Sequence, residues 1–246
     1  GIEFSLNTKP IVTKDFTWEI GGNIAYNENE ITSLSYGENK QSIRRYGVNV
    51  HKVGYSAGMF YVYEQIYDMQ GKPIEGFYKD QNNDGLINEN DLITYHNATP
   101  EYTFGLTTKL KYKEWDLSIA SHGSIGNYNY NSLAAGGASL SASSLYANEW
   151  LAGRPSSALE TNFQTSHNLS SHYVQEASFW RIDNIVLGWS FNNVPKLFSN
   201  GRVYVAVQNP FVFTKYKGLD PEIFGGYDSN LYPRPLTIMV GTNLTF

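Results

Sequence analysis

The sequence predicts an all-β protein: the C-terminal part, about seven strands, of a large antiparallel transmembrane β-barrel with long extracellular loops. Three observations lead to this prediction. Apolar residues alternate with small or polar ones, the alternating segments are about ten residues long, and the connections between them alternate between short and long. Because successive side chains of a strand point to opposite faces, each alternating segment presents one apolar and one polar face.

The alternation begins at the first residues and recurs along the chain. The apolar positions of the seven predicted strands are, in order, Ile2, Phe4 and Leu6; Phe16, Trp18, Ile20 and Ile24; Tyr102, Phe104, Leu106 and Leu110; Trp115, Leu117 and Ile119; Ile185, Leu187, Trp189 and Phe191; Val203, Val205 and Val207; and Ile238, Val240, Leu244 and Phe246. Helical patterns are rare, and residues 139–151 form the only helix candidate. No apolar run approaches the roughly 18 residues of a transmembrane helix.

The lengths of strands and connections favour a barrel over a soluble sandwich. About ten residues at about 3.3 Å each, tilted by about 40°, span the roughly 25 Å apolar band of an outer membrane, whereas ordinary strands are nearer 5–6 residues. Residues 9–15, 113–114 and 192–201 form short connections, and residues 27–100, 127–177 and 210–236 form long ones. Short turns at one rim and long loops at the other are typical of outer-membrane barrels, with the long loops outside the cell.

Seven crossings predict that the chain is part of a larger barrel. Bacterial single-chain barrels have an even number of strands and both ends in the periplasm. If the last strand ends inside at Phe246, the first begins outside at Gly1. Such a strand set leaves open edges, whose unpaired amides and carbonyls are costly in lipid. We therefore expect residues 1–246 to be the C-terminal portion of one barrel domain, paired with N-terminal strands that this chain lacks.

Composition excludes several function classes. The chain has no cysteine, so thiol catalysis, disulfides and cysteine-based metal sites are ruled out. Its net charge of -5, without a basic cluster, argues against nucleic-acid binding. Gly54, Ser56 and Gly58 match the spacing of a hydrolase nucleophile elbow, but an extended pattern follows them where a helix is needed. We expect no enzymatic activity.

Residues 80–91 have the spacing of an EF-hand calcium loop. Asp80, Asn82 and Asp84 occupy positions 1, 3 and 5, the Leu86 carbonyl serves position 7, and Asp91 stands at position 12. Asp91 is shorter than the usual bidentate Glu, which weakens calcium binding or shifts selectivity toward magnesium. We predict a structural calcium ion here, with magnesium as the alternative metal; a metal-free turn rich in Asp and Asn is the competing interpretation.

The long loops are rich in aromatic residues interleaved with Asn, Gln and Asp. Aromatic rings beside polar groups are what a sugar-binding surface needs, because sugars have apolar C–H faces and polar rims. Folded loops also need small cores of their own, which is the competing interpretation. The candidate substrate-binding residues are Tyr61, Tyr63, Tyr128, Tyr130 and Trp150.

Several short motifs, taken together and in this order, resemble the C-terminal region of the SusC/RagA family of TonB-dependent outer-membrane transporters of Bacteroidetes. They are Gly1-Ile2-Glu3, Val53-Gly54 with Gly58-Met59-Phe60-Tyr61, the loop at 80–91, Phe179-Trp180-Arg181-Ile182-Asp183-Asn184-Ile185, Thr214-Lys215-Tyr216-Lys217-Gly218-Leu219-Asp220-Pro221-Glu222, and Tyr232-Pro233-Arg234-Pro235 with Gly241-Thr242-Asn243-Leu244-Thr245-Phe246. The segment 94–100 lacks the glycine that such proteins usually carry before Pro100.

The resemblance implies a multi-pass barrel of 22 strands with an N-terminal plug, which imports glycans or peptides together with a SusD-like surface lipoprotein. The plug and the segment that contacts the TonB system would lie outside this chain. Glycan or oligosaccharide uptake is the function we expect, with outer-membrane lipid around the barrel. The alternatives are an importer for peptides and a calcium-stabilised soluble β-rich binding or adhesion domain.

Overall fold

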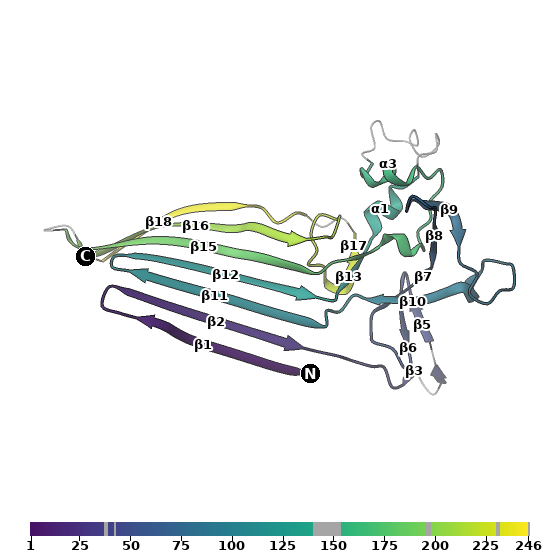
Figure 1. The fold of residues 1–246 in the computed structure, drawn as a ribbon, viewed down its shortest axis with the longest axis horizontal. Helices are drawn as coiled ribbons and strands as arrows, with labels where there is room; N and C mark the ends of the chain where they lie inside the picture. The colour runs from purple at the N-terminus through teal and green to yellow at the C-terminus, as the bar shows by residue number, and fades with distance from the viewer. Residues whose placement is uncertain (37–38, 42, 140–153, 195–197, 230–231, 246) are drawn as a thin grey trace.

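The computed structural model describes residues 1–36, 39–41, 43–139, 154–194, 198–229 and 232–245. The chain has two parts: a long sheet of seven strands, and a region of smaller sheets and short helices at one end of it (Figure 1). This region, which we call the loop region, is built from the long connections. The predicted all-β class is confirmed. Within the described residues, no helix is long and apolar enough to cross a membrane.

The long sheet is antiparallel throughout, and each strand pairs with the next long strand of the chain. Its strands are, in spatial order, β1 (Ile2–Val12), β2 (Phe16–Tyr26), β11 (Tyr102–Tyr112), β12 (Trp115–Ile125), β15 (Phe179–Val194), β16 (Phe198–Thr214) and β18 (Thr237–Thr245). The seven predicted crossings and the alternation of short and long connections are therefore present.

Two predicted turns are shorter in the structure than in the sequence prediction. β1 continues to Val12, into the predicted turn at 9–15, with a register shift between Thr8 and Ile11. Pro10 lies at this shift, where its missing N–H costs no ladder hydrogen bond. β15 and β16 likewise extend to Val194 and from Phe198.

The register separates two faces of the long sheet. One row across all seven strands is apolar and consists of Ile11, Trp18, Leu110, Leu117, Leu187, Val205 and Val240. A second row, three or four residues further along each strand and on the opposite face, is small and polar and consists of Asn7, Gly21, Thr107, Ala120, Asn184, Gln208 and Thr237. Residues directly opposite each other in a ladder share a face, so these rows define an apolar face and a polar face.

The smaller elements all lie in the loop region. Its sheets are β10-β7-β6-β5, β14-β13-β17, β3-β4 and β8-β9. Their bounds are β3 (Leu34–Tyr36), β4 (Asn39–Gln41), β5 (Ile43–Tyr46), β6 (Asn49–Lys52), β7 (Met59–Tyr63), β8 (Gln65–Tyr67), β9 (Pro73–Tyr78), β10 (Leu92–Asn97), β13 (Tyr128–Asn131), β14 (Val174–Glu176) and β17 (Tyr227–Asp228). The short helices are η1 (Glu89–Asp91), α1 (Ser132–Gly136), α3 (Ser157–Thr161), η2 (Ser171–Tyr173) and η3 (Phe224–Gly226). The helix candidate at 139–151 lies almost wholly outside the described residues.

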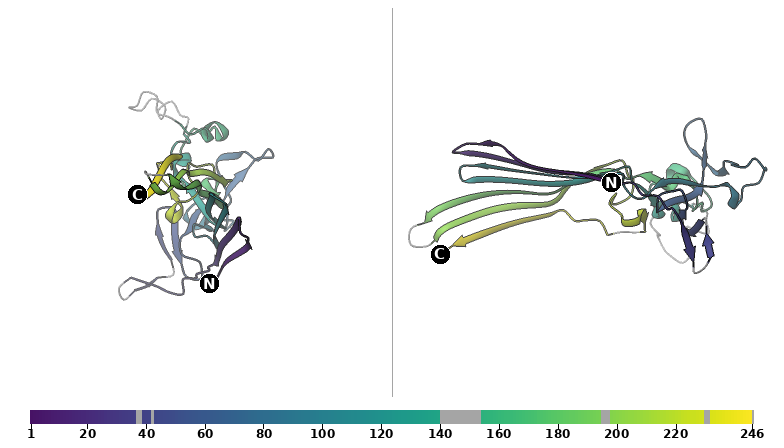
Figure 2. Two further views of the ribbon diagram at one scale, coloured as in Figure 1. Left: turned by 90° about the vertical axis from the view of Figure 1, so that its left-hand side faces the viewer. Right: turned by 90° about the horizontal axis from the view of Figure 1, so that it is seen from below.

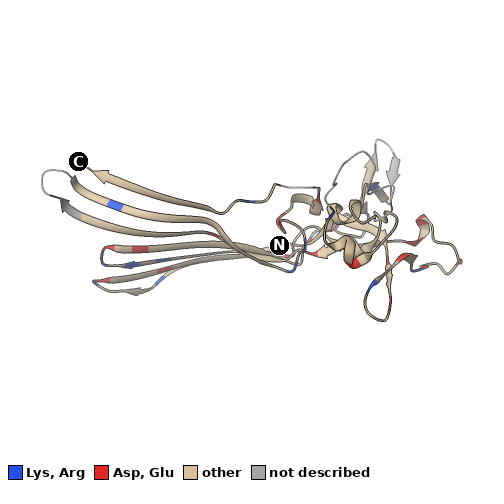
Figure 3. Ribbon diagram, turned by 90° about the horizontal axis from the view of Figure 1, so that it is seen from above, with Lys and Arg blue, Asp and Glu red and all other residues tan. Residues whose placement is uncertain are grey.

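The buried core of the chain lies in the loop region and not under the long sheet. It is formed by Val48, Phe60, Val62, Ala98, Tyr130, Ala134, Ala135, Ala138, Tyr173 and Val174. Two further views show the long sheet extending from one side of this region as a single curved layer (Figure 2). Charged residues gather near the short turns and in the loop region, with long uncharged stretches of strand between them (Figure 3).

Candidate functional site

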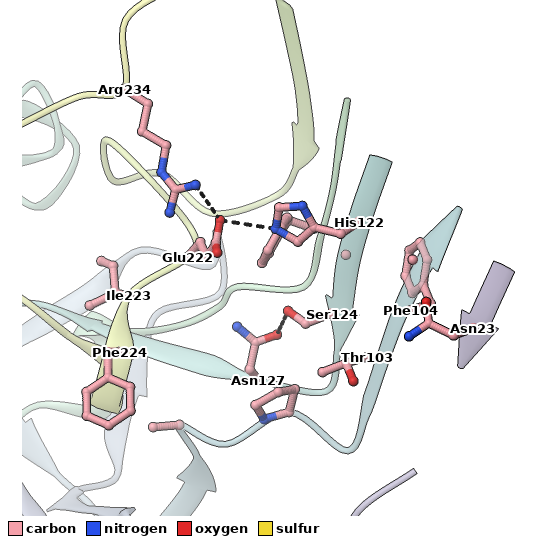
Figure 4. Close-up of a pocket in the computed structure, with 15 residues that line it drawn as sticks. Asn23, Thr103, Phe104, His122, Ser124, Asn127, Glu222, Ile223, Phe224 and Arg234 are labelled. Atoms are coloured by element: carbon pink, nitrogen blue, oxygen red, sulfur yellow. Dashed lines mark hydrogen bonds and ion pairs between the residues drawn. The ribbon is translucent and has the colours of Figure 1, made fainter. Parts of the chain in front are cut away.

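A pocket of about 640 Å³ opens where the polar face meets the loop region (Figure 4). Three strands supply one wall through Asn23 of β2, Thr103 of β11, and His122 and Ser124 of β12. The connection between β16 and β18, residues 215–236, supplies the other wall; we call it the cap segment. The pocket is completed by Ala98, Pro100, Phe104, Gly105, Gly123, Asn127, Phe179, Glu222, Ile223, Phe224 and Arg234.

The strand register places Asn23 and His122 side by side in the wall. Asn23 and His122 both pair with Gly105, so the three residues form one row. A Cβ at Gly105 would lie only 2.5 Å from Asn23 Oδ1. The Asn23 side chain therefore lies over Gly105, in space that a larger residue there would need.

A network of charged side chains joins the cap segment to β15. Arg181 Nη2 donates to Asp220 Oδ1 at 2.6 Å, and Arg234 Nε lies 3.1 Å from Asp220 Oδ2. Arg234 Nη1 is 2.9 Å from Glu222 Oε2. Asp220 therefore forms ion pairs with two guanidinium groups, one on strand β15 and one on the cap segment itself.

His122 connects the same network to β12. Its Nδ1 lies 2.8 Å from Asp183 Oδ1, and its Nε2 lies 3.3 Å from Glu222 Oε2. Phe179 packs edge-on against the imidazole, with 5.5 Å between ring centroids. The imidazole thus lies between a carboxylate on the sheet and a carboxylate on the cap segment.

A buried polar contact fixes the cap segment on its other side, where Asn129 Nδ2 donates to the Pro221 carbonyl at 2.8 Å. Within the cap segment, the Tyr216 hydroxyl donates to Asp228 Oδ2 at 2.6 Å. Asn129 and Asp228 are fully buried. Burial, followed by the hydrogen bond to Asp228, raises the pKa of Tyr216, so its hydroxyl stays protonated and can donate. The cap segment is therefore attached both to the polar face and to the loop core.

The predicted metal loop has the local conformation of a closed Asp/Asn turn. Gly85, with a φ of +80°, donates its N–H to Asp80 Oδ2 at 2.8 Å, and Leu86 N–H donates to Asp84 Oδ1 at 2.8 Å. Asp91 is fully buried and accepts from the backbone of Gln81 and Asn88, and these bonds, that to Asn88 foremost, lower its pKa.

Only part of the predicted ligand set has an oxygen that is free to bind a cation. Asp80 Oδ1 is buried without a hydrogen-bond partner, which leaves one carboxylate oxygen available at the first ligand position. Within the described residues, however, no group of three His, Asp or Glu side chains is close enough to hold a metal ion. Metal binding by Asp80, Asn82, Asp84, Leu86 and Asp91 therefore stays a prediction.

The structure does not bring the candidate aromatic residues together on one ligand surface. Tyr61 lies under the Arg45 guanidinium at 5.2 Å, Tyr63 contacts Tyr78, and Tyr128 stacks on His96 at 3.7 Å. None of these three tyrosines lines the pocket of Figure 4. Trp150 lies outside the described residues.

The structure places Tyr130 in a buried position, and a substrate contact at this residue stays a prediction. Its side chain is 2% exposed, its ring stacks on Tyr227 at 5.5 Å, and its hydroxyl donates to the Asn168 carbonyl. Tyr130 belongs to the core of the loop region, because a folded loop of this size needs apolar contacts of its own. Ser56, at the centre of the Gly-rich motif, donates its hydroxyl to the Asn29 carbonyl at 2.7 Å within a turn.

The residues of the pocket and of the charged network beside it were not among the predicted site residues. Arg181, Asp183, Asp220, Glu222 and Arg234 all lie in the short motifs that carried the family resemblance. A usable signal was present: Arg181 and Asp183 are charged residues inside an otherwise uncharged strand. Their partners are 39 or more positions away in the chain, so the sequence could not show which charges meet.

Comparison with known proteins supports the same kind of fold. The chain is 42% identical over 261 residues to the TonB-dependent receptor SusC of Bacteroides thetaiotaomicron, and 26% identical over 286 residues to the TonB-dependent receptor P3 of Formosa agariphila. Both alignments cover the whole chain but only 26% and 28% of those relatives. The chain thus spans about a quarter of their length. No protein-family model matches.

Solved structures show the same arrangement. The structure of the RagAB peptide transporter superposes with a TM-score of 0.77 over 99% of this chain and 29% of that one, at 24% identity. The closed-closed state of the RagAB peptide importer gives the same score at 22% identity. The two-faced antiparallel sheet and its folded loops are therefore part of the barrel of a TonB-dependent receptor. The chain is thus similar over its whole length to SusC, a protein of the family that its sequence motifs resemble.

Proposed function

We propose that this chain forms part of the barrel wall and of the extracellular loops of a TonB-dependent importer for glycans in the bacterial outer membrane. The observation that carries the proposal is the exposed apolar face. Leu187 is 45% exposed, Val205 41% and Val240 72%, and all three lie in one row of the sheet. A continuous apolar face of this kind is stable against lipid and not against water.

The dimensions of the sheet agree with a membrane crossing. Strand β11 has 11 residues. At about 3.3 Å per residue and a tilt of about 40°, such a strand spans the roughly 25 Å apolar band of an outer membrane. A soluble binding domain would leave the same face in water, so the relatives and the exposed face favour transport over adhesion. The relatives are named receptors, and a transport role requires no enzymatic chemistry.

The proposed function includes two partners that act through the complete protein. The TonB system would supply energy through parts outside this chain. A SusD-like lipoprotein would cover the rim formed by the loop region, where a stable interface needs about 1,200–2,000 Å² of total buried surface. Co-purification of the tagged complete protein from native membranes tests this pairing. A barrel that remains solitary in mild detergent contradicts it.

Uptake by the native host tests the import function. Cells that lack the complete protein should lose uptake of a fluorescent oligosaccharide, and a plasmid-borne copy should restore it only when the TonB system is intact. Peptide import is the alternative, because the solved relatives are named peptide transporters. Labelled peptides in parallel separate the two substrates. Restoration of uptake in cells without the TonB system contradicts the proposal.

We further propose that residues 80–91 bind calcium as a structural ion outside the cell. Support comes from the ligand spacing and from the unpartnered Asp80 Oδ1. Extracellular calcium modules work at dissociation constants of about 10⁻⁴–10⁻³ M. Calcium at 5 mM should therefore slow proteolysis of this loop, and Asp84→Ala should abolish the effect. Asp68→Ala, which removes an Asp turn outside the loop, is the matched control. Equal cleavage with calcium and with chelator contradicts the proposal.

A further inference from the structure

We propose that the pocket between the polar face and the cap segment is a binding subsite for a neutral, hydroxyl-rich ligand, such as a stretch of uncharged oligosaccharide. The inference rests on the proposed import function and adds the charge class of the substrate and the residues that contact it. It does not involve the aromatic candidates of the sequence prediction.

The size and position of the pocket suit a ligand. Its volume of about 640 Å³ lies within the range of about 300–1,000 Å³ that is usual for small-molecule sites. Its walls come from strands β2, β11 and β12 and from the cap segment, which the buried Arg181–Asp220 pair fixes in place. Both walls are thus positioned before a ligand arrives.

The charged groups around the pocket are already paired with each other. Arg181 and Arg234 face the carboxylates of Asp220 and Glu222, and Asp183 faces His122. An anionic ligand would have to compete for these guanidinium groups, and a cationic ligand for these carboxylates. A neutral ligand competes for neither.

Hydrogen-bonding capacity remains after these pairs form. Asn23 and Thr103 are exposed, and their side chains make no hydrogen bond within the described part of the chain. The ion-pair contacts of the Glu222 carboxylate all engage Oε2, which leaves Oε1 as an available acceptor. An amide, a hydroxyl and a carboxylate oxygen can together accept from and donate to neighbouring hydroxyl groups of a sugar.

An aromatic ring is also present. Phe224 follows Glu222 closely in the cap segment, lines the pocket and is fully exposed to solvent. Because this ring is not packed against other side chains, it can stack on the apolar C–H face of a sugar ring. The polar groups and the exposed ring therefore provide the two kinds of contact that a carbohydrate needs.

The test uses the complete transporter in lipid nanodiscs and calorimetric titration with defined probes. Maltooligosaccharides, xylooligosaccharides and fructooligosaccharides represent neutral ligands; oligogalacturonates are anionic, chitosan oligomers are cationic, and a mixed tryptic peptide pool represents peptides. We expect binding by at least one neutral series and at least tenfold weaker binding by charged oligosaccharides and peptides. Preferential binding of a charged series or of peptides overturns the proposal, as does the absence of binding by every neutral series.

Affinity measurements on variants then test whether the ligand binds in this pocket. Asn23→Leu and Glu222→Gln should each weaken binding of the neutral probe by about 3- to 10-fold, the effect of one or two lost hydrogen bonds. Phe224→Ala should weaken it comparably. Lys111→Gln, on the same face of β11 as Thr103 but near the short turns, is the matched control and should bind normally. Unchanged affinity in all three pocket variants overturns the subsite, even if TonB-dependent uptake is intact and import stands.

Discussion

Arg181 and Asp220 form a buried ion pair between a barrel strand and the cap segment. Arg181 Nη2 lies 2.6 Å from Asp220 Oδ1, and the two side chains are only 5% and 8% exposed. Arg181 belongs to β15, whereas Asp220 lies in the connection that follows β16. A pair with this burial attaches the cap segment to the sheet at a fixed point. Separating the two side chains would leave a charge buried without its partner, which is energetically costly.

Loss of the Asp220 charge should release the cap segment. In Asp220→Asn, Arg181 keeps only its longer contact with Glu222, at 3.5 Å, and loss of one partner of a buried pair costs up to about 3–5 kcal/mol. Proteolysis of the complete protein should then cut within 215–236, while the barrel still shows heat-modifiable migration. Glu160→Gln removes only the exposed contact with Lys217 of the same segment, a kind of pair worth about 0–1 kcal/mol. Equal protease resistance in both variants contradicts the role of Asp220.

Two adjacent glycines separate backbone strain from crowding. Gly225 and Gly226 have φ values of +74° and +69°, so alanine is strained at either position. At Gly226 a Cβ would also lie 2.5 Å from the Cβ of Ala98, whereas at Gly225 it would meet nothing within 4 Å. Gly225→Ala should cost about 1 kcal/mol of local stability and Gly226→Ala clearly more, as measured by hydrogen exchange. Equal losses of local stability in the two variants would contradict the expected crowding between residue 226 and Ala98.

Glu75 should make one contact of the loop region sensitive to acid. Its Oε1 accepts from Gln164 N, Thr165 N and Thr165 Oγ1 at 2.8–2.9 Å, and His167 Nε2 lies 3.5 Å away. Burial alone would raise the pKa of Glu75, but the hydrogen bonds from Thr165 and Gln164 outweigh burial, and the pKa lies below its ordinary value of 4.5.

The sign of the pH dependence follows from this lowered pKa. The stabilisation is complete above pH 4.5 and is lost as the pH falls through the folded-state pKa of Glu75. Exchange of the Thr165 amide should accelerate below that pH in the native protein and should be fast already at neutral pH in Glu75→Gln. Glu176→Gln, at an exposed contact with Lys215, should behave like the native protein. Acid-independent exchange at Thr165 in the native protein would contradict the expected linkage.

A charge on the apolar face should impair assembly, whereas a charge one residue away should not. Leu187 belongs to the apolar row, and its neighbour Val186 pairs with Ser118 and Ala206 on the polar face. Arginine facing lipid at mid-membrane costs about 2–4 kcal/mol. Leu187→Arg should therefore reduce the fraction of heat-modifiable barrel in native membranes, and Val186→Arg should leave it nearly unchanged. The reverse order would mean that the two faces are assigned the wrong way round.

The sequence predicted the long sheet because period-two alternation is a local property. Rows such as Leu117, Leu187 and Val205 follow directly from which residues alternate, and the turn lengths fix their order. The pocket has no such local signal, because Asn23, His122 and Glu222 meet only after the barrel strands and the cap segment come together. Aromatic composition could not predict the burial of Tyr130, since it does not distinguish a ring in a loop core from a ring that faces a ligand.

The central claim is that the apolar face contacts lipid and the polar face lines the inside of an importer. Spin labels placed singly along β15, from Ile185 to Ser190, in the complete protein in liposomes test it most directly. Oxygen, which concentrates in lipid, should broaden the signal at 185, 187 and 189, and a water-soluble nickel complex should do so at 186, 188 and 190. Access of the nickel complex to Leu187 equal to its access to Val186 would contradict the account.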